Sequence, residues 1–519
     1  MKMSVSIFSR MNNYSWMMTK TFTEYKRHEP TQSLLYQVLD QNIQEFFDTV
    51  AQDPDHKALP DFIMHEFDKF LKCGVLSEGF VRLKCDECSH SIIVPFSCKC
   101  RGFCPSCAGR RMSERSFHLA DNVIPFVPTR HWVLSVPFEL RYWMASDDDL
   151  LKEVNKILCD EINNYLRKKA RKLGIKGGET GIVSYLQRAG SALNLNLHFH
   201  LLALDGLYTV DDAGDPIFHR IPGIHDHEVA RVVDRVSRRV VKYLRKSGRL
   251  SAQGEEVYIG DQSEDNDVTL AHLKRASISS RIALGERAGL KVRRIGGSFG
   301  YEEEIPKSQG YGCASKNGFS IHAATAINAH ERDRLEQLLR YLGRGPVAHD
   351  KVSLDQHGNI LYELKKSYDG ATHVLFSPLE FIEKLASIIP PPYRHQVNYY
   401  GCLSSHSNLR PLIVPAASIE KGSEDKKPSP GVPLEELQSG DLEEGAEKPS
   451  RYIPWAELLK RTFGIDLTVC PHCGGQVRVI AAIIRKEAID EILGHLNLPT
   501  GPPKKAKPHG TEYVYESFS

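Results

Sequence analysis

Apolar side chains recur at a helical spacing of three and four positions in five segments of the chain. This spacing places them on one face of a helix, so we expect an amphipathic helix in each segment. Thr31 or Ser33 is a suitable N-cap for the first helix, and Gly74 is a suitable stop after the second. The expected helices span residues 33–51, 61–72, 148–172, 227–246 and 328–342.

Alternation of apolar and polar positions predicts strands between these helices. In residues 194–205, Asn194, Asn196, His198 and His200 share one face, and leucine and phenylalanine occupy the other. Strands that alternate with helices in this way favour an α+β fold. The expected strands span residues 132–136, 181–187 and 194–205, and residues 207–219 resemble a hairpin.

The chain has 519 residues, of which 41% are hydrophobic and 25% are charged, as in ordinary globular proteins. This length suffices for two to four domains. Residues 416–450 are rich in Lys, Glu, Ser, Gly and Pro, which predicts a disordered linker. We therefore expect a helical and cysteine-rich domain at 25–120, a large domain at 125–415 and a small C-terminal module at 451–498.

No stretch approaches 18 consecutive apolar residues, and the first twenty residues lack the apolar core of a secretory signal. We therefore expect no membrane partner and a cytoplasmic location. The net charge is only +2, but residues 231–249 carry eight Lys or Arg against one Asp, 274–294 carry seven against one Glu, and 101–115 carry four Arg against one Glu. Such segments are typical of phosphate-contacting surfaces, although a solvated helix face has the same composition.

Six of the twelve cysteines stand in CxxC pairs, a grouping that in a non-secreted chain indicates metal binding rather than disulfides. Two CxxC pairs are separated by fifteen residues, a spacing that predicts a four-cysteine zinc module, and Cys98 and Cys100 between them could compete as ligands. The module is either a structural staple or a DNA contact formed with neighbouring arginines. The predicted zinc ligands are Cys85, Cys88, Cys104 and Cys107, and the neighbouring arginines are Arg101, Arg110, Arg111 and Arg115.

A third knuckle, Cys470-Pro-His-Cys473-Gly-Gly, lies near the C-terminus. Gly474 permits the tight turn of a zinc knuckle, but the sequence offers no second cysteine pair beside it. His472 or His495 could complete a zinc site there, or the two cysteines could be free thiols.

His198 and His200 lie two positions apart on the polar face of their strand, where two imidazoles can chelate one divalent ion. The alternative is a pair of hydrogen-bonded histidines on an exposed strand face. A second triplet, at residues 225–227, follows a Pro-Gly pair and is expected to be incidental. For a third metal ligand, Gln187 is the first candidate and Gln337 the second.

Tyr341 lies near the end of the expected helix 328–342, on its more polar face. A tyrosine among arginines can attack a phosphodiester, because the phenolate can form a covalent phosphotyrosine and the arginines stabilise charge on the phosphate. A tyrosine at a helix end more often serves packing. The arginines near Tyr341 are Arg334, Arg340 and Arg344.

Nine segments together resemble the rolling-circle HUH transposases of the ninety-one-type insertion sequences and their common-region relatives. They keep the order of that family and cover about residues 25–495. The resembling segments are LLYQVLDQNIQEFF, CGVLSEGFVRLKCDEC, FSCKCRGFCPSCAGRRM, HWVLSVPFELRY, LQRAGSALNLNLHFHLLALDG, LLRYLGRGPVA, GATHVLFSPLEFIEKLASIIPPP, VNYYGCLSSHSNLR and WAELLKRTFGIDLTVCPHCGG.

The resemblance implies a zinc-binding domain followed by an HUH nuclease domain, whose antiparallel sheet carries the histidine strand near its centre and is flanked by helices. It implies that His198 and His200 bind Mg²⁺ or Mn²⁺ and that Tyr341 cleaves single-stranded DNA at the element ends, retaining the 5′ phosphate. Some members carry a second tyrosine four residues later, but Gly345 stands there, as in the single-tyrosine branch. A prokaryotic, nucleoid-associated protein with DNA as its partner is expected.

Three other functions remain compatible with the residues themselves. A plasmid replication initiator or relaxase would use the same chemistry. A non-catalytic zinc DNA-binding protein would not need His198, His200 or Tyr341. A tyrosine recombinase would need an Arg/His constellation without a metal.

Overall fold

The computed structural model describes residues 27, 29–53, 57–221, 223–250, 268–296, 310–368, 370–414, 455–463, 465–501 and 503. The linker predicted at 416–450 and most of the final twenty residues lie outside the described residues. No helix within these described ranges combines the length and the apolar character needed to cross a membrane.

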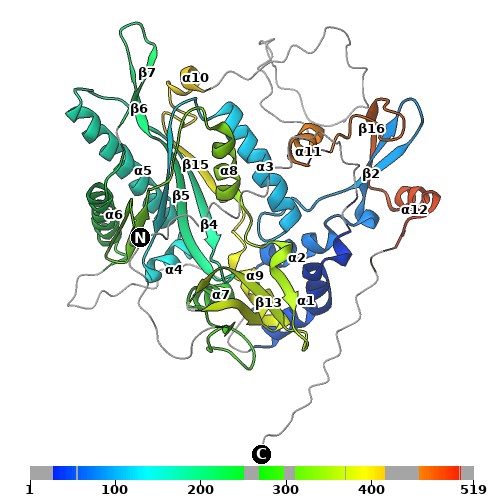
Figure 1. Cartoon of the computed structure of the whole chain (residues 1–519). Helices are drawn as coiled ribbons and strands as arrows, with labels where there is room; N and C mark the ends of the chain where they lie inside the picture. Colours follow the sequence, from blue (N-terminus) through cyan, green and yellow to red (C-terminus); the bar gives the residue numbers. More distant parts are fainter. Residues whose placement is uncertain are drawn as a thin grey trace, which may run out of the picture.

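A seven-stranded antiparallel sheet forms the centre of the molecule (Figure 1). The strand β5 (Leu195–Leu204) lies between β4 and β3, so the histidine strand is central, and the mixed α+β architecture with antiparallel sheets is confirmed. The strand order is β15-β4-β5-β3-β10-β9, with β11 also paired to β3. The other strands are β3 (Thr129–Ser135), β4 (Gly181–Ala189), β9 (Cys313–Lys316), β10 (Phe319–His322), β11 (Ala326–Ile327) and β15 (Val397–Gly401).

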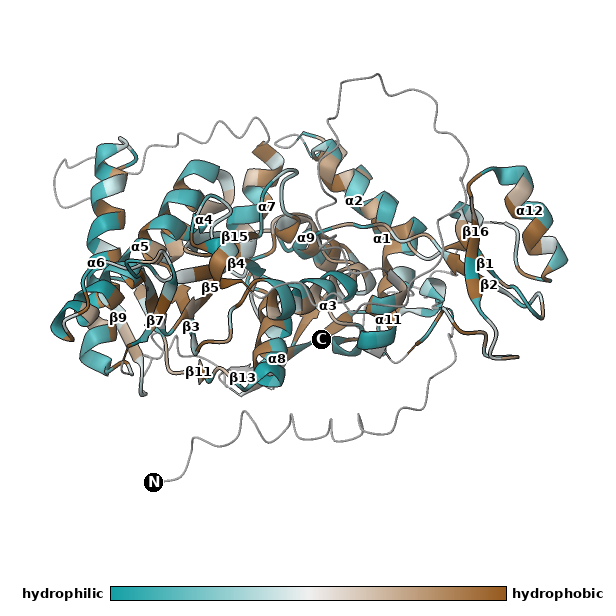
Figure 2. Ribbon diagram, turned by 90° about the horizontal axis from the view of Figure 1, so that it is seen from above, coloured by the Kyte–Doolittle hydropathy of each residue, from teal (hydrophilic) through white to brown (hydrophobic). Residues whose placement is uncertain are grey.

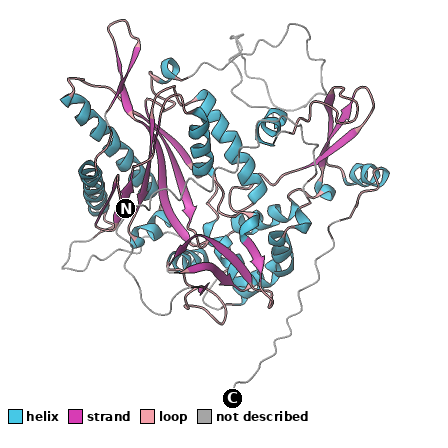
Figure 3. Cartoon of the chain, in the orientation of Figure 1, coloured by secondary structure: helices cyan, strands magenta, loops and turns pink. Residues whose placement is uncertain are grey.

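The two faces of this sheet are covered by different helices, as Figure 3 shows. Leu195, Leu197 and Phe199 are buried on one face, which confirms the predicted alternation along the histidine strand. The helices on that side are α4 (Phe138–Ser146), α5 (Asp148–Lys172), α6 (Asp226–Lys246) and α7 (Val268–Ile278). The opposite face packs against α3 (Pro105–Asn122) and α8 (Arg332–Gly343).

A four-stranded antiparallel sheet lies beside this domain, in the order β12-β13-β14-β8. Two N-terminal helices and α9 (Pro378–Ile388) pack near it, and α1 contacts both α9 and β12. Its strands are β12 (Val352–Leu354), β13 (Ile360–Tyr368), β14 (Ala371–Phe376) and β8 (Arg293–Ile295). The N-terminal helices are α1 (Leu34–Gln52) and α2 (Asp61–Lys72).

A three-stranded antiparallel sheet combines the two ends of the chain (Figure 2). The strands β1 (Phe80–Cys85) and β2 (Ser91–Pro95) come from the N-terminal region, and β16 (Val477–Ile483) comes from the C-terminal module. The C-terminal helices are α11 (Trp455–Phe463) and α12 (Lys486–His495). A hairpin of β6 (Gly206–Val210) and β7 (Pro216–Arg220) occurs where the sequence predicts one.

Most predicted helices are confirmed within a few residues. Ser33 accepts a hydrogen bond from the Tyr36 amide and so caps α1, and the predicted bounds of α5 agree with the structure. The helix α8 begins at Arg332 rather than 328. The reason is a local turn, in which the Glu331 carboxylate accepts a hydrogen bond from the Asn328 amide before the helix starts.

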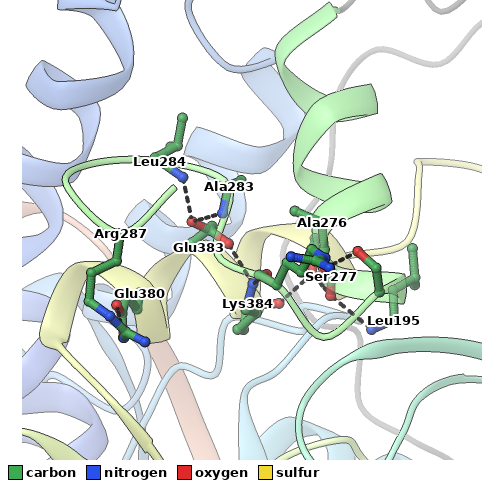
Figure 4. A network of polar contacts seen from close by, with 12 residues as sticks. Leu195, Ala276, Ser277, Ala283, Leu284, Arg287, Glu380, Glu383 and Lys384 are labelled. Atoms are coloured by element: carbon green, nitrogen blue, oxygen red, sulfur yellow. Dashed lines mark hydrogen bonds and ion pairs between the residues drawn. The ribbon is translucent and has the colours of Figure 1, made fainter. Parts of the chain in front are cut away.

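A buried ion pair on α9 connects this helix to the segment after α7 (Figure 4). Lys384 Nζ lies 2.6 Å from Glu383 Oε1 and donates to the Arg281 carbonyl, while Glu383 Oε2 accepts from the Ala283 amide at 2.9 Å and the Leu284 amide at 3.0 Å. Both side chains are almost completely buried. Removing either partner therefore leaves a buried charge without its counter-ion.

We expect Lys384→Met to lower the free energy of unfolding by about 3 kcal/mol, because Glu383 loses its buried cation. Thermal denaturation of the full chain measures this effect. Arg238→Ala, which removes an exposed i,i+4 pair with Asp234, is the control and should change stability by less than about 0.5 kcal/mol. Equal melting temperatures for Lys384→Met and the control would contradict the account of the buried pair.

Candidate active site

His198 and His200 lie side by side on β5, with their ring centroids 5.0 Å apart. In the register of the sheet, Gln187 on β4 stands opposite His198, and Tyr185 stands opposite His200. On the other side of β5 lies β3, where Val133 stands opposite His200. The alternation of β5 therefore directs both imidazoles to the face that α8 partly covers.

Hydrogen bonds orient the two imidazoles. His198 Nδ1 lies 2.7 Å from the Asn196 carbonyl oxygen. Because a carbonyl only accepts, this Nδ1 carries the proton and the Nε2 lone pair stays available. His200 Nδ1 lies 2.9 Å from His131 Nε2, in a bond that joins neighbouring strands. Sequence reasoning missed His131, since only the pairing of β3 with β5 brings it close.

Burial is the main cause of the low pKa values of these histidines. It lowers the pKa of His131 to about 4 and, together with the nearby His198 and His131, lowers the pKa of His200 to about 2. Burial also lowers the pKa of His198. All three imidazoles are therefore neutral near pH 7, which is the form that binds a metal.

Tyr341 lies in the last turn of α8, close to the histidine pair. The centroid of its ring is 5.8 Å from that of His200 and 6.4 Å from that of His131. Lys365 Nζ donates a hydrogen bond of 2.8 Å to the phenol oxygen, and the Arg344 guanidinium lies 4.6 Å from the ring centroid. The structure thus brings Tyr341 beside a histidine pair that lies more than a hundred residues earlier in the sequence.

Two local contacts fix the end of α8 over the sheet. Gln187 Nε2 donates a hydrogen bond of 3.0 Å to the Leu342 carbonyl. After the helix, a Cβ atom at Gly345 would lie only 2.5 Å from the Cβ of Ala108 on α3. A tyrosine at position 345 would therefore require the backbone of α3 or of this loop to move.

A cleft of about 960 Å³ opens in front of Tyr341 and the histidines. Of the arginines predicted to contact DNA, four line it, namely Arg101, Arg111, Arg115 and Arg344. The remaining three, Arg110, Arg334 and Arg340, do not line it. Arg334 and Arg340 form ion pairs with Glu331 and Glu336, respectively.

The other two basic segments lie outside the cleft. No described residue of 231–249 or 274–294 lines it. Arg239 on α6 is paired with Asp160 and Glu161 on the neighbouring helix α5, so part of that charge serves helix packing.

Arg188 is a cleft residue that the sequence did not single out. Its side chain is buried, and its Nε donates to the Ile388 carbonyl at 3.2 Å. Among the described residues, no group accepts a hydrogen bond from its Nη1 or Nη2. Burial lowers the pKa of Arg188 to about 9. A buried guanidinium with two free donors beside a cleft is suited to an anionic ligand.

The remaining candidates differ in their positions. Gln187 lines the cleft beside His198, whereas Gln337 is exposed and does not line it. His225 and His227 are exposed at the start of α6, with ring centroids 5.7 Å apart, and neither lines the cleft.

The structure corrects the predicted grouping of the zinc cysteines. Cys104 and Cys107 form a cluster with Cys73 and Cys98, whereas Cys85 and Cys88 form a separate cluster with Cys470 and Cys473. The single module of two consecutive CxxC pairs is therefore wrong. The two pairs are separated because the first pair lies at the turn between β1 and β2, whereas the second pair lies at the start of α3.

In the first cluster, Cys73 Sγ lies 3.8 Å from the sulfurs of both Cys104 and Cys107, and Cys98 Sγ lies 3.3 Å from that of Cys107. Cys100 is outside the cluster, which decides between the two competing thiols in favour of Cys98. Cys73 was missed because it is an isolated cysteine in the sequence, at the end of α2.

The comparisons with known proteins concern two parts of the chain. Residues 181–410 match a family model described as "Putative transposase", and residues 42–136 match one described as "Transposase zinc-binding domain", of the IS91 type. Both matches are to transposase families. They support a transposase role, with DNA as the partner and structural zinc in the N-terminal domain. No curated protein and no solved structure matches the chain.

The transposase match contains His198, His200 and Tyr341, and the zinc-binding match contains all four cysteines of the first cluster. Cys470 and Cys473 lie outside both matched regions.

Proposed function

We propose that this protein is a transposase that nicks single-stranded DNA at the ends of its element, with Tyr341 as nucleophile and a divalent ion held by His198 and His200. The observation that carries the proposal is the position of Tyr341 beside the histidine pair in a basic cleft. The same reaction would leave a 5′-phosphotyrosine and a free 3′ hydroxyl for strand transfer in rolling-circle transposition.

The donor set fits Mg²⁺ or Mn²⁺. His198 has its Nε2 available, and His200 has the same atom available when its Nδ1 donates to His131. We propose that His131 fixes this tautomer. The side-chain oxygen of Gln187, on the neighbouring strand, is the candidate third ligand. A bound divalent ion would polarise the scissile phosphate as a Lewis acid.

The chain's own residues account for the remaining chemistry. The Tyr341 oxygen attacks phosphorus, a P–O bond to Tyr341 forms, and the bond to the 3′ oxygen breaks. The phenol proton is lost to solvent, and the 3′ oxygen leaves as a hydroxyl after taking up a proton. Lys365 places positive charge beside the attacking oxygen, and Arg344 places it over the Tyr341 ring, where both stabilise the charge that develops.

Several features favour a single strand as the ligand. Tyr341 is half-buried within the cleft, so a phosphate must enter to reach it. An unpaired strand can enter this cleft, and the arginines that line the cleft can follow the strand's backbone. Arg188 also lines this cleft, and its buried Nη1 and Nη2 have no hydrogen-bond partner among the described residues.

Lys365→Met should slow cleavage about a hundredfold while leaving DNA affinity nearly unchanged, since the ammonium acts on the nucleophilic oxygen. Single-turnover cleavage rates and binding of a fluorescent oligonucleotide separate the two effects. The matched control is Lys242→Met, an exposed lysine outside the cleft. A loss of binding equal to the loss of rate would show that Lys365 only contacts DNA.

Arg188→Met should raise the melting temperature but weaken binding of single-stranded DNA, because it removes a buried guanidinium whose Nη donors have no described partner. The slope of log affinity against log salt should become smaller by about 0.7, the value for one phosphate contact to a single strand. Arg231→Met, at an exposed position of α6, is the control. Higher stability with unchanged DNA affinity would rule out the phosphate contact.

The function itself is tested with labelled single-stranded oligonucleotides that tile the DNA flanking the coding gene. We expect a covalent protein–DNA adduct at discrete positions, dependent on Mg²⁺ or Mn²⁺. A non-catalytic DNA-binding protein would bind without forming an adduct. A donor plasmid that carries the same flanks separates transposition from plasmid replication, because only transposition inserts the flanked segment elsewhere.

A further inference from the structure

Two cysteine pairs that are far apart in the sequence, Cys85/Cys88 and Cys470/Cys473, lie next to each other in the structure. Cys85 Sγ lies 3.4 Å from Cys473 Sγ, and Cys88 Sγ lies 3.6 Å from Cys470 Sγ, although 388 and 382 positions separate them in the sequence. All four sulfurs lie within 4.8 Å of one another. A tetrahedral ion with Zn–S bonds of about 2.3 Å requires sulfurs about 3.8 Å apart, which is close to this arrangement.

The surrounding backbone holds each pair in a knuckle. The Cys470 amide donates to the Gly475 carbonyl at 2.8 Å, and the Gly475 amide lies 3.4 Å from Cys473 Sγ. The two knuckles also touch each other, since a Cβ atom at Gly475 would lie 2.8 Å from the carboxyl carbon of Glu87. The thiolate-facing amides and the close contact are typical of a zinc ribbon.

Strand pairing brings the two knuckles into register. In the sheet, Cys85 stands opposite Val477, and the Asp86 amide donates to the Gln476 carbonyl at 3.0 Å. Figure 1 shows β16 and β2 at the same edge of the molecule, and β1 lies between them in the sheet. Among the described residues, five buried side chains form the core beneath the knuckles, with five partly buried ones packed against them. The buried residues are Leu83, Cys85, Leu467, Cys470 and Val477, and the partly buried ones are Val81, Ile92, Val94, Leu459 and Ile465. A core this small generally needs a metal or disulfide staple.

We propose that Cys85, Cys88, Cys470 and Cys473 bind one structural Zn²⁺ that fastens the C-terminal module to the N-terminal zinc-binding domain. This ion is separate from the one expected at Cys73, Cys98, Cys104 and Cys107, and the proposal does not depend on the nuclease chemistry. Because Cys470 and Cys473 lie outside both family matches, neither match assigns this site. The zinc closes the intervening chain, including the catalytic cleft, into a loop.

Zinc content of the purified full chain, measured by native mass spectrometry, tests the shared site. Wild type should carry two ions per chain, one for each cluster. Cys470→Ser/Cys473→Ser, Cys85→Ser/Cys88→Ser and the quadruple variant should each lose the same single ion. Cys313→Ser, outside both clusters, should keep two. If either double variant retained two ions, or if the quadruple variant lost two, the shared site would be overturned.

Thiol alkylation of wild type gives a second readout that needs no variant to fold. Cys88 and Cys473 are exposed, so without zinc they should react rapidly. With zinc, all four thiolates should be protected, and they should become labelled together as a chelator is added. Labelling of Cys470 and Cys473 at a chelator concentration that leaves Cys85 and Cys88 protected would show that the pairs do not share an ion.

Discussion

Tyr341→Phe should abolish the covalent protein–DNA adduct and slow strand cleavage by at least about a thousandfold. Phenylalanine keeps the ring that lies 5.8 Å from the His200 ring, together with its contacts to Lys365 and Arg344, but lacks the nucleophilic oxygen. The variant should therefore remain folded and bind single-stranded DNA normally. Adducts are resolved by denaturing electrophoresis, and folding is checked by thermal denaturation.

Tyr185→Phe is the matched control, because Tyr185 also lines the cleft and stands opposite His200 in the sheet. Its hydroxyl is buried and has no hydrogen-bond partner among the described residues. Burial also raises the pKa of Tyr185, so the hydroxyl stays protonated. This variant should cleave within about threefold of wild type, since its packing is preserved. Loss of the adduct in Tyr185→Phe and its retention in Tyr341→Phe would reverse the assignment.

His198→Ala/His200→Ala should remove measurable Mn²⁺ binding at the cleft and reduce cleavage by at least about a thousandfold, because both imidazole ligands are lost. Isothermal titration with Mn²⁺ measures the affinity independently of catalysis. Zinc content should be unchanged, since the two cysteine clusters lie elsewhere.

The chain offers an internal control in its second histidine triplet. His225→Ala/His227→Ala removes the same number of imidazoles from an exposed position outside the cleft. Mn²⁺ affinity and cleavage should both stay at the wild-type level. Equal loss in the two double variants, or Mn²⁺ binding that survives in His198→Ala/His200→Ala, would contradict the proposed metal site.

Local periodicity predicted much of the fold. The bounds of α5 and the two faces of the histidine strand follow from residues that are close in sequence, and the structure confirms both. The position of the histidine strand at the centre of an antiparallel sheet came from the resemblance to a family rather than from periodicity. The predicted start of α8 was four residues too early, because Asn328 and Glu331 form a local turn before the helix begins.

The parts of the candidate site that depend on tertiary pairing could not be predicted. His131 reaches His200 only through the pairing of β3 with β5, and Lys365 reaches Tyr341 only because β13 lies beside the end of α8. The division of the cysteines into two clusters also depends on the pairing of β1 with β16, which joins the ends of the chain. A CxxC pair identifies two zinc ligands but carries no information about the other two.

The most direct test of the central claim is the identity of the residue that becomes bound to DNA. Wild type is incubated with Mn²⁺ and a single-stranded oligonucleotide that it cleaves, then digested with nuclease and trypsin, and the modified peptide is sequenced by mass spectrometry. We predict a 5′-phosphonucleotide on Tyr341. Modification of a different tyrosine, or cleavage that leaves no covalent adduct, would contradict the proposed mechanism.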